Sequence, residues 1–334
     1  MRGFLLVNLG TPDSPEVKDV RKYLMEFLSD PLVIDTHPIV RWLIVNFIIA
    51  PFRSRKSAAL YKKLWTERGS PLLFHGLDLR DQVAGILGRE WKVELGMRYG
   101  QPSIGSAIKS LADTTDMTVF LLFPQYSAAA FESAKLKVEE EIAQQGYTGR
   151  VKILKPYFDH PQFIQSFSDL ARPHIKDYKK VFFTFHGIPV RHCKNSSPQS
   201  TRCTVDKACC DTLRDDNRNC YKAQCFASAR GIAKNLGITD YEIVFQSRFG
   251  RDPWIQPFAD YRLDDIIKEE VESVIYISPS FTADCLETVE EIGVGYRELF
   301  LNGKGKKFHL VESLNSRKEW AEAVVAIAHD QGLA

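Results

Sequence analysis

The chain has 334 residues, of which 44% are hydrophobic and 26% are charged. These proportions are typical of a soluble globular protein and exclude a disordered, fibrous or membrane-spanning chain. Lysine and arginine total 44 against 42 acidic residues, so the net charge is only +2 and no overall positive field indicates nucleic-acid binding. The N-terminal apolar run ends at Asn8 and is too short for a secretory signal, so we expect a cytoplasmic protein.

Apolar segments of strand length recur along the chain and alternate with segments of helical period. The expected strands are Phe4–Asn8, Val93–Tyr99, Thr118–Phe123, Val151–Leu154, Val181–Phe185, Glu242–Gln246, Val274–Ser278 and Phe308–Val311. Short strands that alternate with helices indicate parallel sheets flanked by helices. The strand exits of the two sets also resemble each other, as in MRYGQP and QSRFGRDP. We therefore predict an α/β protein of two similar Rossmann-like halves, each with a four-stranded parallel sheet.

The division of the chain follows from this duplication. We expect a first half over 1–155 and a second half over 156–315, with the C-terminal helix, 316–334, packing back on the first half. In open α/β sheets a ligand binds beyond the carboxyl ends of the strands. Residues at the strand exits are therefore the ones in which to look for chemistry.

The segment 36–66 departs from the alternation of strands and helices. It contains no acidic residue and combines an apolar run, Ile39–Phe52, with several arginines and lysines. The run is too short to span a membrane. Apolar side chains beside cations suit peripheral contact with a membrane surface, or the lip of a pocket for a flat, acidic ligand. A core helix with a basic, solvated rim is the alternative.

Two strand exits of the second half carry residues suited to acid–base and metal chemistry. His186 ends a strongly apolar segment, where a neutral imidazole can act as a base or as a metal ligand. Glu287, Glu290 and Glu291 follow a later exit at helical spacings and predict one acidic stripe. A structural histidine and a solvated acidic face are the alternatives. If both exits meet at one crevice, a histidine and a carboxylate can hold a divalent cation and exchange protons.

The exits of the first half supply Arg98 and Tyr126. An arginine there can pair with a ligand carboxylate and a tyrosine can stack or hydrogen-bond, although an arginine with a structural partner fits equally well. Neither GxGxxG after the first strand nor GxxxxGK[ST] occurs. We therefore expect no nucleotide cofactor.

Six of the seven cysteines lie in one segment, 193–225. They are Cys193, Cys203, Cys209, Cys210, Cys220 and Cys225. The absence of a CxxC pair argues against a zinc ribbon, whereas a four-thiolate iron–sulfur site tolerates longer spacings. We predict an iron–sulfur cluster in preference to zinc or free thiols, and the spacing leaves open which four cysteines bind it.

Taken together, the exit motifs resemble the ferrochelatase family, whose members insert Fe²⁺ into a porphyrin to make haem. The matching segments, in family order, are LLVNLGTPDSP, RGSPLL, MRYGQP, FPQYS, FHGIP, FQSRFGRDPW and SFTADCLETVEEI. The resemblance implies a type II chelatase-like fold, with Fe²⁺ and a porphyrin as substrates, protoporphyrin IX ahead of coproporphyrin. A chelatase for another metal such as cobalt and a non-catalytic tetrapyrrole or iron–sulfur sensor are the alternatives.

The resemblance also implies roles for single residues. His186 and Glu287 correspond to the metal-binding and catalytic pair, with Glu291 as a further metal-binding carboxylate. Cys285 stands where many members have histidine, and Gly295 stands where they have a third acidic residue. The residues expected to contact the porphyrin are Leu9, Arg98, Tyr126 and Phe281.

Two further expectations come from the same resemblance. Some bacterial members hold a [2Fe–2S] cluster in an insertion after the HGIP motif, which implies such a cluster in the segment 193–225. The segment 36–66 resembles the pocket lip, which touches a membrane in many members. Both a monomer and a homodimer are compatible with the sequence.

Overall fold

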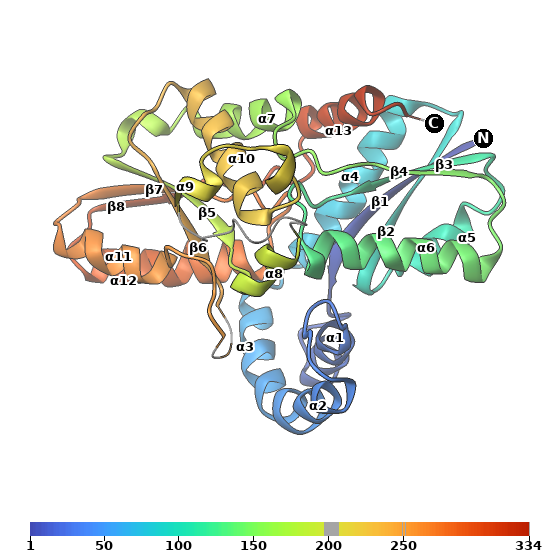
Figure 1. The fold of residues 1–334 in the computed structure, drawn as a ribbon, viewed down its shortest axis with the longest axis horizontal. Coiled ribbons are helices and arrows are strands. Elements are labelled where there is room, and N and C mark those ends of the chain that lie inside the picture. Colours follow the sequence, from blue (N-terminus) through green and yellow to red (C-terminus); the bar gives the residue numbers. More distant parts are fainter. Residues whose placement is uncertain (197–206, 249, 251, 334) are drawn as a thin grey trace. The chain divides into compact units, whose positions relative to one another are not determined.

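The computed structural model describes residues 1–196, 207–248, 250 and 252–333, and these form two compact units. Unit 1 comprises Met1–Phe123, Ala128–Pro156 and Asn315–Ala334, and unit 2 comprises Pro124–Ser127 and Tyr157–Leu314. Each unit contains a four-stranded parallel sheet with helices packed on it (Figure 1).

The eight strands expected from the sequence are all present. They are β1 (Arg2–Thr11), β2 (Trp91–Gly100), β3 (Asp116–Leu121), β4 (Arg150–Ile153), β5 (Lys180–His186), β6 (Glu242–Gln246), β7 (Ser273–Ile277) and β8 (Lys307–Leu310). Their order is β2-β1-β3-β4 in unit 1 and β6-β5-β7-β8 in unit 2, and all pairings of these strands are parallel. The same order in both units confirms the prediction of two similar α/β halves.

The first strand of each unit has a glycine at its C-terminal end, inside β1 and directly after β5, that the backbone geometry requires. Gly10 has a φ of +114°, and a Cβ atom there would lie 1.8 Å from the carbonyl oxygen of Tyr99. A Cβ atom on Gly187 would lie 2.8 Å from the carbonyl oxygen of Gln246. Since only glycine permits such close approach, the backbone at these two positions can lie against the neighbouring strands β2 and β6, and His186 is the last residue of β5.

The helices of unit 1 cover its sheet and include the C-terminal helix. They are α1 (Val17–Ser29), α2 (Pro38–Leu43), α3 (Ser54–Leu64), α4 (Pro71–Leu87), α5 (Ile104–Ser110), α6 (Ser133–Gln145) and α13 (Lys318–Asp330), with the π-helical segments η1 (Ile44–Arg53) and η2 (Ala128–Glu132). Helix α13 packs against α4. Its Trp320 is buried, and its ring lies edge-on to Phe120 of β3 with 6.5 Å between ring centroids.

The segment 36–66 forms α2, η1 and α3, and most of its large apolar side chains are exposed. The exposed residues, which we call the apolar ridge, are Ile39, Val40, Trp42, Leu43, Phe47, Ile48 and Phe52. Only the opposite side of η1, with Val45 and Ile49, is buried. The alternative of a core helix with a basic rim is therefore wrong for this segment. Arg53, Arg55 and Lys56 follow the ridge and are exposed as well.

The helices of unit 2 flank the second sheet. They are α7 (Pro161–Ala171), α8 (Val190–Asn195), α9 (Lys207–Cys210), α10 (Tyr221–Leu236), α11 (Ala259–Lys268) and α12 (Arg297–Asn302), with the 3-10 turns η3 (Ile175–Asp177) and η5 (Asp215–Asn217) and the π-helix η6 (Glu287–Tyr296).

Residues 124–127, which the sequence-based division placed in the first half, group with unit 2. Their polar groups are bound by α10. The Gln125 side-chain amide donates to the Ser228 hydroxyl at 3.0 Å, and the Tyr126 backbone N–H donates to the Gln224 side-chain oxygen at 2.5 Å.

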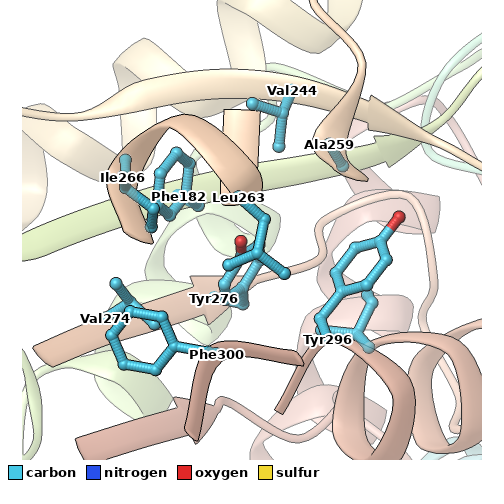
Figure 2. Packing of buried hydrophobic residues seen from close by; sticks show 10 residues of the cluster. Phe182, Val244, Ala259, Leu263, Ile266, Val274, Tyr276, Tyr296 and Phe300 are labelled. Carbon is cyan, nitrogen blue, oxygen red and sulfur yellow. The ribbon is translucent and has the colours of Figure 1, made fainter. Parts of the chain in front are cut away.

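The core of unit 2 fixes the helix that carries the acidic residues. Figure 2 shows Tyr276, Tyr296 and Phe300 among the aromatic side chains of this core, together with Phe182 of β5. Ile292 and Tyr296 of η6 belong to the same cluster. Each large apolar side chain that is fully buried in this way stabilises the fold by about 1.5–3 kcal/mol, so η6 is held against the core of unit 2.

Candidate active site

His186 is the last residue of β5, and its imidazole ring has a defined hydrogen-bonding direction. Its Nδ1 atom lies 2.6 Å from the carbonyl oxygen of Gly187. A carbonyl oxygen can only accept, so Nδ1 carries the proton and Nε2 of the neutral ring carries the lone pair. Nε2 is therefore the atom of His186 that can take a proton or bind a metal ion.

Phe281 supplies an aromatic side chain beside this imidazole. It follows β7, and its ring meets that of His186 in an edge-on arrangement with 6.4 Å between centroids. Both side chains are half-buried. The sequence assigned these two residues to one site although they are 95 positions apart. The structure brings their side chains together.

The acidic residues lie on a π-helix, so the α-helical geometry assumed for their stripe is wrong. The helix η6 begins at Glu287 and closes its hydrogen bonds over five residues instead of four. Because a turn then takes more residues, Glu290 no longer shares the face of Glu287, whereas Glu291 stays close to it. Helical segments of this kind are frequent at functional sites.

The Glu291 carboxylate is held by several donors of unit 2. It accepts from the Ser247 backbone N–H at 3.0 Å, from the Ser247 hydroxyl, from the Gln246 side-chain amide at 3.3 Å and from the Tyr296 hydroxyl at 3.3 Å. Burial raises the pKa of Glu291 and the charge of Glu287 adds to this rise, while the Ser247 hydrogen bond and the electrostatic interaction with His186 act against it. Charges on His186, Glu287 and Glu291 therefore influence one another directly.

Glu287 stands in the first turn of η6 and is half-buried. Its backbone carbonyl accepts from the Gln246 side-chain amide at 3.1 Å. Its side chain contacts the thiol of Cys285, a weak hydrogen-bond donor, and burial together with this carboxylate raises the pKa of that thiol. Cys285 is thus a neutral neighbour of Glu287.

Within the described residues, no group of three or more histidine, cysteine, aspartate or glutamate side chains is arranged to hold a metal ion. His186, Glu287 and Glu291 thus interact electrostatically, but they do not form a preformed three-ligand site for a metal ion. A metal ion held by fewer protein groups keeps coordination positions open for another ligand.

Arg98 of unit 1 is engaged in a buried network. Its Nη2 donates to the Asp30 carboxylate at 2.5 Å and its Nε donates to the Ser133 hydroxyl at 2.7 Å. The same Asp30 oxygen accepts from the Tyr99 hydroxyl at 2.9 Å and from the Ser133 hydroxyl at 2.5 Å. The Arg98 side chain is 16% exposed and that of Asp30 is 3% exposed. The structural partner that the sequence left as an alternative is therefore present.

Leu9 and Tyr126, the other two residues expected to contact the porphyrin, are half-buried. Leu9 lies near the end of β1 in unit 1, and Tyr126 belongs to the short segment grouped with unit 2. The structure thus gathers His186, Phe281, Glu287 and Glu291 within one unit, and places Leu9 and Arg98 in the other.

Comparison with known proteins identifies the family. The family model described as Ferrochelatase matches residues 1–331. The chain is 41% identical over 332 residues to a ferrochelatase of Legionella pneumophila (strain Lens), with 99% of each chain covered. It is 42% identical over 332 residues to a ferrochelatase of Coxiella burnetii (strain RSA 493), with 98% of this chain and 92% of the relative covered.

The chain belongs to the ferrochelatase family.

A solved structure supports the fold assignment. SirB from Bacillus subtilis with Fe³⁺ matches this ferrochelatase-family chain with a TM-score of 0.53 at 9% identity, covering 99% of this chain and 96% of that one. The type II chelatase-like fold expected from the sequence is thereby confirmed. In the part of the chain that the structure describes, no helix has both the length and the apolar character needed to cross a bilayer.

Three cysteines of this ferrochelatase-family chain converge in unit 2. The thiols of Cys193 on α8 and Cys210 on α9 hydrogen-bond to the sulfur of Cys220, the residue that caps α10. These two hydrogen bonds lower the pKa of Cys220. Lys222 is also buried nearby, and its charge favours the thiolate forms of Cys210 and Cys225.

The other three cysteines of the segment 193–225 are Cys203, Cys209 and Cys225. Cys225 is buried on α10 and contacts the Tyr221 hydroxyl, while Cys209 is half-buried. Cys203 lies outside the described residues. Cys193 and Cys210 thus each contact Cys220, and the choice of four ligands among the six cysteines stays a prediction.

Sequence reasoning did not assign a role to Ser247, Gln246 or Tyr221. The first two hold Glu291, and they form part of the segment FQSRFGRDPW that carried the family resemblance. Tyr221 gives no local signal, because it stands among the cysteines and its partner, the His186 carbonyl, is 35 residues away.

Proposed function

We propose that this chain inserts Fe²⁺ into a porphyrin, with release of two pyrrole protons and formation of haem. Membership of the ferrochelatase family over residues 1–331 supports the reaction class. The observation that carries the mechanism is the hydrogen bond from His186 Nδ1 to the Gly187 carbonyl, since it leaves the Nε2 lone pair available.

His186 is the proposed base. Two of the four pyrrole nitrogens carry protons that must leave before the ring can bind Fe²⁺, and a neutral imidazole accepts such protons near neutral pH. The edge of Phe281 lies beside the ring and presents an apolar surface to the macrocycle. Each proton taken by Nε2 leaves the imidazole cationic, and the nearby carboxylates of Glu287 and Glu291 stabilise that cation.

Glu287 and His186 are the proposed first contacts of the substrate iron, with Glu291 behind them. Hard and borderline cations such as Fe²⁺ accept carboxylate and imidazole ligands. Because few protein groups hold the ion, the pyrrole nitrogens can complete its coordination and remove it from the protein. Glu291, whose pKa is raised by burial, is suited to receive a proton from His186 and pass it on.

The porphyrin is proposed to contact Leu9, Arg98, Tyr126 and Phe281. A groove that binds the bent macrocycle better than the flat one stabilises the transition state, because bending exposes the nitrogen lone pairs to the metal. Since Asp30 and Ser133 already bind most of the Arg98 guanidinium, Arg98 is expected to orient a ring substituent through its small exposed face. Protoporphyrin IX is the porphyrin we propose.

The apolar ridge is the proposed site of peripheral membrane contact in a cytoplasmic protein. Trp42, Phe47 and Phe52 are 57%, 60% and 76% exposed, and cationic side chains follow them in the sequence. Exposed aromatic and aliphatic side chains beside cations insert into the interface of an anionic bilayer. Such contact would place the protein where apolar tetrapyrroles partition.

A [2Fe–2S] cluster is proposed for the cysteine segment. Cys193, Cys210 and Cys220 are proposed for three of its four ligand positions because the first two contact the sulfur of Cys220, and the buried Lys222 would offset the negative charge of the thiolates. Cys203, Cys209 and Cys225 are the candidates for the fourth position. When bound, such a cluster would supply one-electron redox chemistry or structural cross-linking.

The cluster is tested by the visible absorbance and by the electron paramagnetic resonance signal after reduction of anaerobically purified protein. Cys220→Ala should lose both signals, because Cys220 contacts the other two thiols. Cys285→Ala, which removes a buried cysteine outside the segment, should retain them. A colourless wild-type protein that contains no sulfide would contradict the cluster.

The insertion activity is tested with anaerobic protein, protoporphyrin IX and Fe²⁺, while the porphyrin absorbance and fluorescence are followed. Wild-type protein should convert many equivalents to haem, and His186→Ala should bind porphyrin without turnover. Porphyrin binding that stops at one equivalent in the wild type, without turnover, would favour the alternative of a non-catalytic tetrapyrrole or iron–sulfur sensor. Preferential turnover with Co²⁺ over Fe²⁺ would favour a chelatase for another metal.

A further inference from the structure

The peptide that joins His186 to Gly187 lies where the pairing of β5 with one neighbour has ended. The pairing of β5 with β7 ends at Phe183–Ile277, whereas its pairing with β6 continues to His186–Gln246. Beyond Phe183, the backbone groups of β5 that face away from β6 need partners other than a strand. Buried backbone groups without partners are costly, so side chains that supply them have a structural reason to be there.

Two side chains supply these partners. The Tyr221 hydroxyl donates to the His186 carbonyl oxygen at 2.9 Å, and the Ser280 hydroxyl accepts from the His186 N–H at 3.4 Å. On the other side, the Gly187 N–H donates to the Gln246 carbonyl oxygen at 2.7 Å. The peptide between His186 and Gly187 is therefore bound at both its C=O and its N–H.

Tyr221 is buried and its hydroxyl has a complete set of partners. The hydroxyl proton is directed to the His186 carbonyl, and the Ser280 hydroxyl and the Cys225 thiol also contact the phenolic oxygen. Tyr221 is also the first residue of α10, so its position is set by the helix and by the adjoining cysteine segment. A buried, fully bonded tyrosine on a helix provides a rigid anchor.

The orientation of this peptide decides where the imidazole points. The ring of His186 is oriented by donation from Nδ1 to the Gly187 carbonyl, and Gly187 has no Cβ to restrict its backbone. If the preceding peptide rotates, the Gly187 carbonyl moves and the imidazole loses its acceptor. A shift of about 1 Å in a reacting group can reduce turnover about 100-fold.

We propose that Tyr221 is a positioning residue for metal insertion: its hydroxyl holds the His186–Gly187 peptide and thereby aims His186 Nε2 at the reacting pyrrole. This inference rests on the proposed role of His186 as the base. Because Tyr221 is buried and its hydroxyl is bound to the His186 carbonyl, we expect it to act on the reaction only through His186.

The test compares Tyr221→Phe, which removes only the hydroxyl, with Tyr276→Phe in the same unit. Tyr276 is fully buried in β7, and its hydroxyl has no hydrogen-bond partner among the described residues. Tyr221→Phe should lower kcat about ten-fold while KM for porphyrin and porphyrin affinity, measured by fluorescence quenching, stay within about two-fold. Tyr276→Phe should leave kcat unchanged.

A spectroscopic measurement separates positioning from a general loss of structure. Nitrogen NMR of labelled histidine, with the His186→Ala spectrum used for assignment, should show the Nδ1–H tautomer in the wild type and a mixture of tautomers in Tyr221→Phe. If Tyr221→Phe does not fold, Ser280→Ala tests the same network from its other side and should lower kcat while leaving porphyrin affinity unchanged.

The outcomes distinguish this inference from the function on which it rests. Full kcat in Tyr221→Phe, or a loss of kcat matched by loss of porphyrin binding, would overturn the positioning role. Absence of turnover in the wild type would overturn the proposed function, and full turnover in His186→Ala would overturn the role of His186. Wild-type turnover, its loss in His186→Ala and a kcat-only defect in Tyr221→Phe together support the proposal.

Discussion

The backbone N–H of Ser247 donates to the carboxylate of Glu291 at 3.0 Å, across 44 residues of sequence. Ser247 has a φ of +64°, a left-handed conformation that costs free energy in a residue other than glycine. Such conformations persist where surrounding contacts enforce them and are frequent at functional sites. Here the conformation directs the N–H to Glu291, so the carboxylate is bound by protein donors before any substrate arrives.

Glu287 therefore differs from Glu291 as a ligand for incoming iron. We predict that Glu287→Gln lowers kcat for Fe²⁺ insertion by at least about 100-fold, because the amide is a weaker ligand and cannot accept a proton. Glu290→Gln is the matched control on the same π-helix and should change kcat by less than about two-fold, as Glu290 lies off the face of Glu287. Steady-state insertion kinetics check this, and equal losses in the two variants would contradict it.

The buried pair of Asp30 and Arg98 should be critical for the stability of unit 1. Asp30→Ala would leave the Arg98 guanidinium buried and unpaired, which is expected to cost about 3 kcal/mol in the free energy of unfolding. Urea denaturation measures this loss. Asp113→Ala removes the exposed partner of Lys92 and should change the free energy of unfolding much less, because an exposed ion pair contributes little. Equal losses in the two variants would show that burial of the ion pair does not decide its contribution.

The apolar ridge should bind membranes through its aromatic side chains. The double variant Trp42→Ser, Phe47→Ser should reduce sedimentation with vesicles containing phosphatidylglycerol by more than about ten-fold, since each buried aromatic contributes about 1.5–3 kcal/mol. Leu136→Ser is the control, because Leu136 is 45% exposed on α6 and lies outside the ridge. Wild-type protein that stays in the supernatant would rule out the membrane contact.

The ion pairs around Glu242 should make stability depend on acid pH. Burial alone raises the pKa of Glu242, but hydrogen bonds from Arg262 and Lys180 outweigh it, and the pKa is lowered. A lowered pKa in the folded state means that the stabilisation is present above the unfolded value of about 4.3 and is lost as the pH falls through the folded value.

Glu242→Gln should therefore reduce the free energy of unfolding at pH 7 by about 1 kcal/mol, a small value because the side chain is still 25% exposed. The difference from the wild type should shrink as the pH falls below about 4.3. Urea denaturation across this pH range provides the measurement. A difference that grows in acid would have the wrong sign and would refute the assignment.

The strands could be predicted because burial of a strand leaves a local record. Strands covered by helices on both faces need uninterrupted apolar side chains, and β6 was predicted with the bounds that the structure shows, Glu242–Gln246. The sequence also predicted that His186 and Glu287 share a site, because parallel strands bring their carboxyl ends to one edge, and the structure has both residues in unit 2. The segment that contains the apolar ridge was recognisable in the sequence as a departure from this pattern. The sequence did not decide whether its apolar side chains are exposed or buried.

The contacts between distant segments were decided by the tertiary structure alone. Three features depend on packing partners that no local periodicity encodes. They are the contact of Tyr221 with His186, the ion pair of Arg98 with Asp30, and the π-helical winding of η6. Sequence pattern reports which face of an element is buried, since that preference is a property of each side chain. The direction of a polar side chain depends on which donors and acceptors lie within about 3 Å after folding, and only the folded chain brings them there.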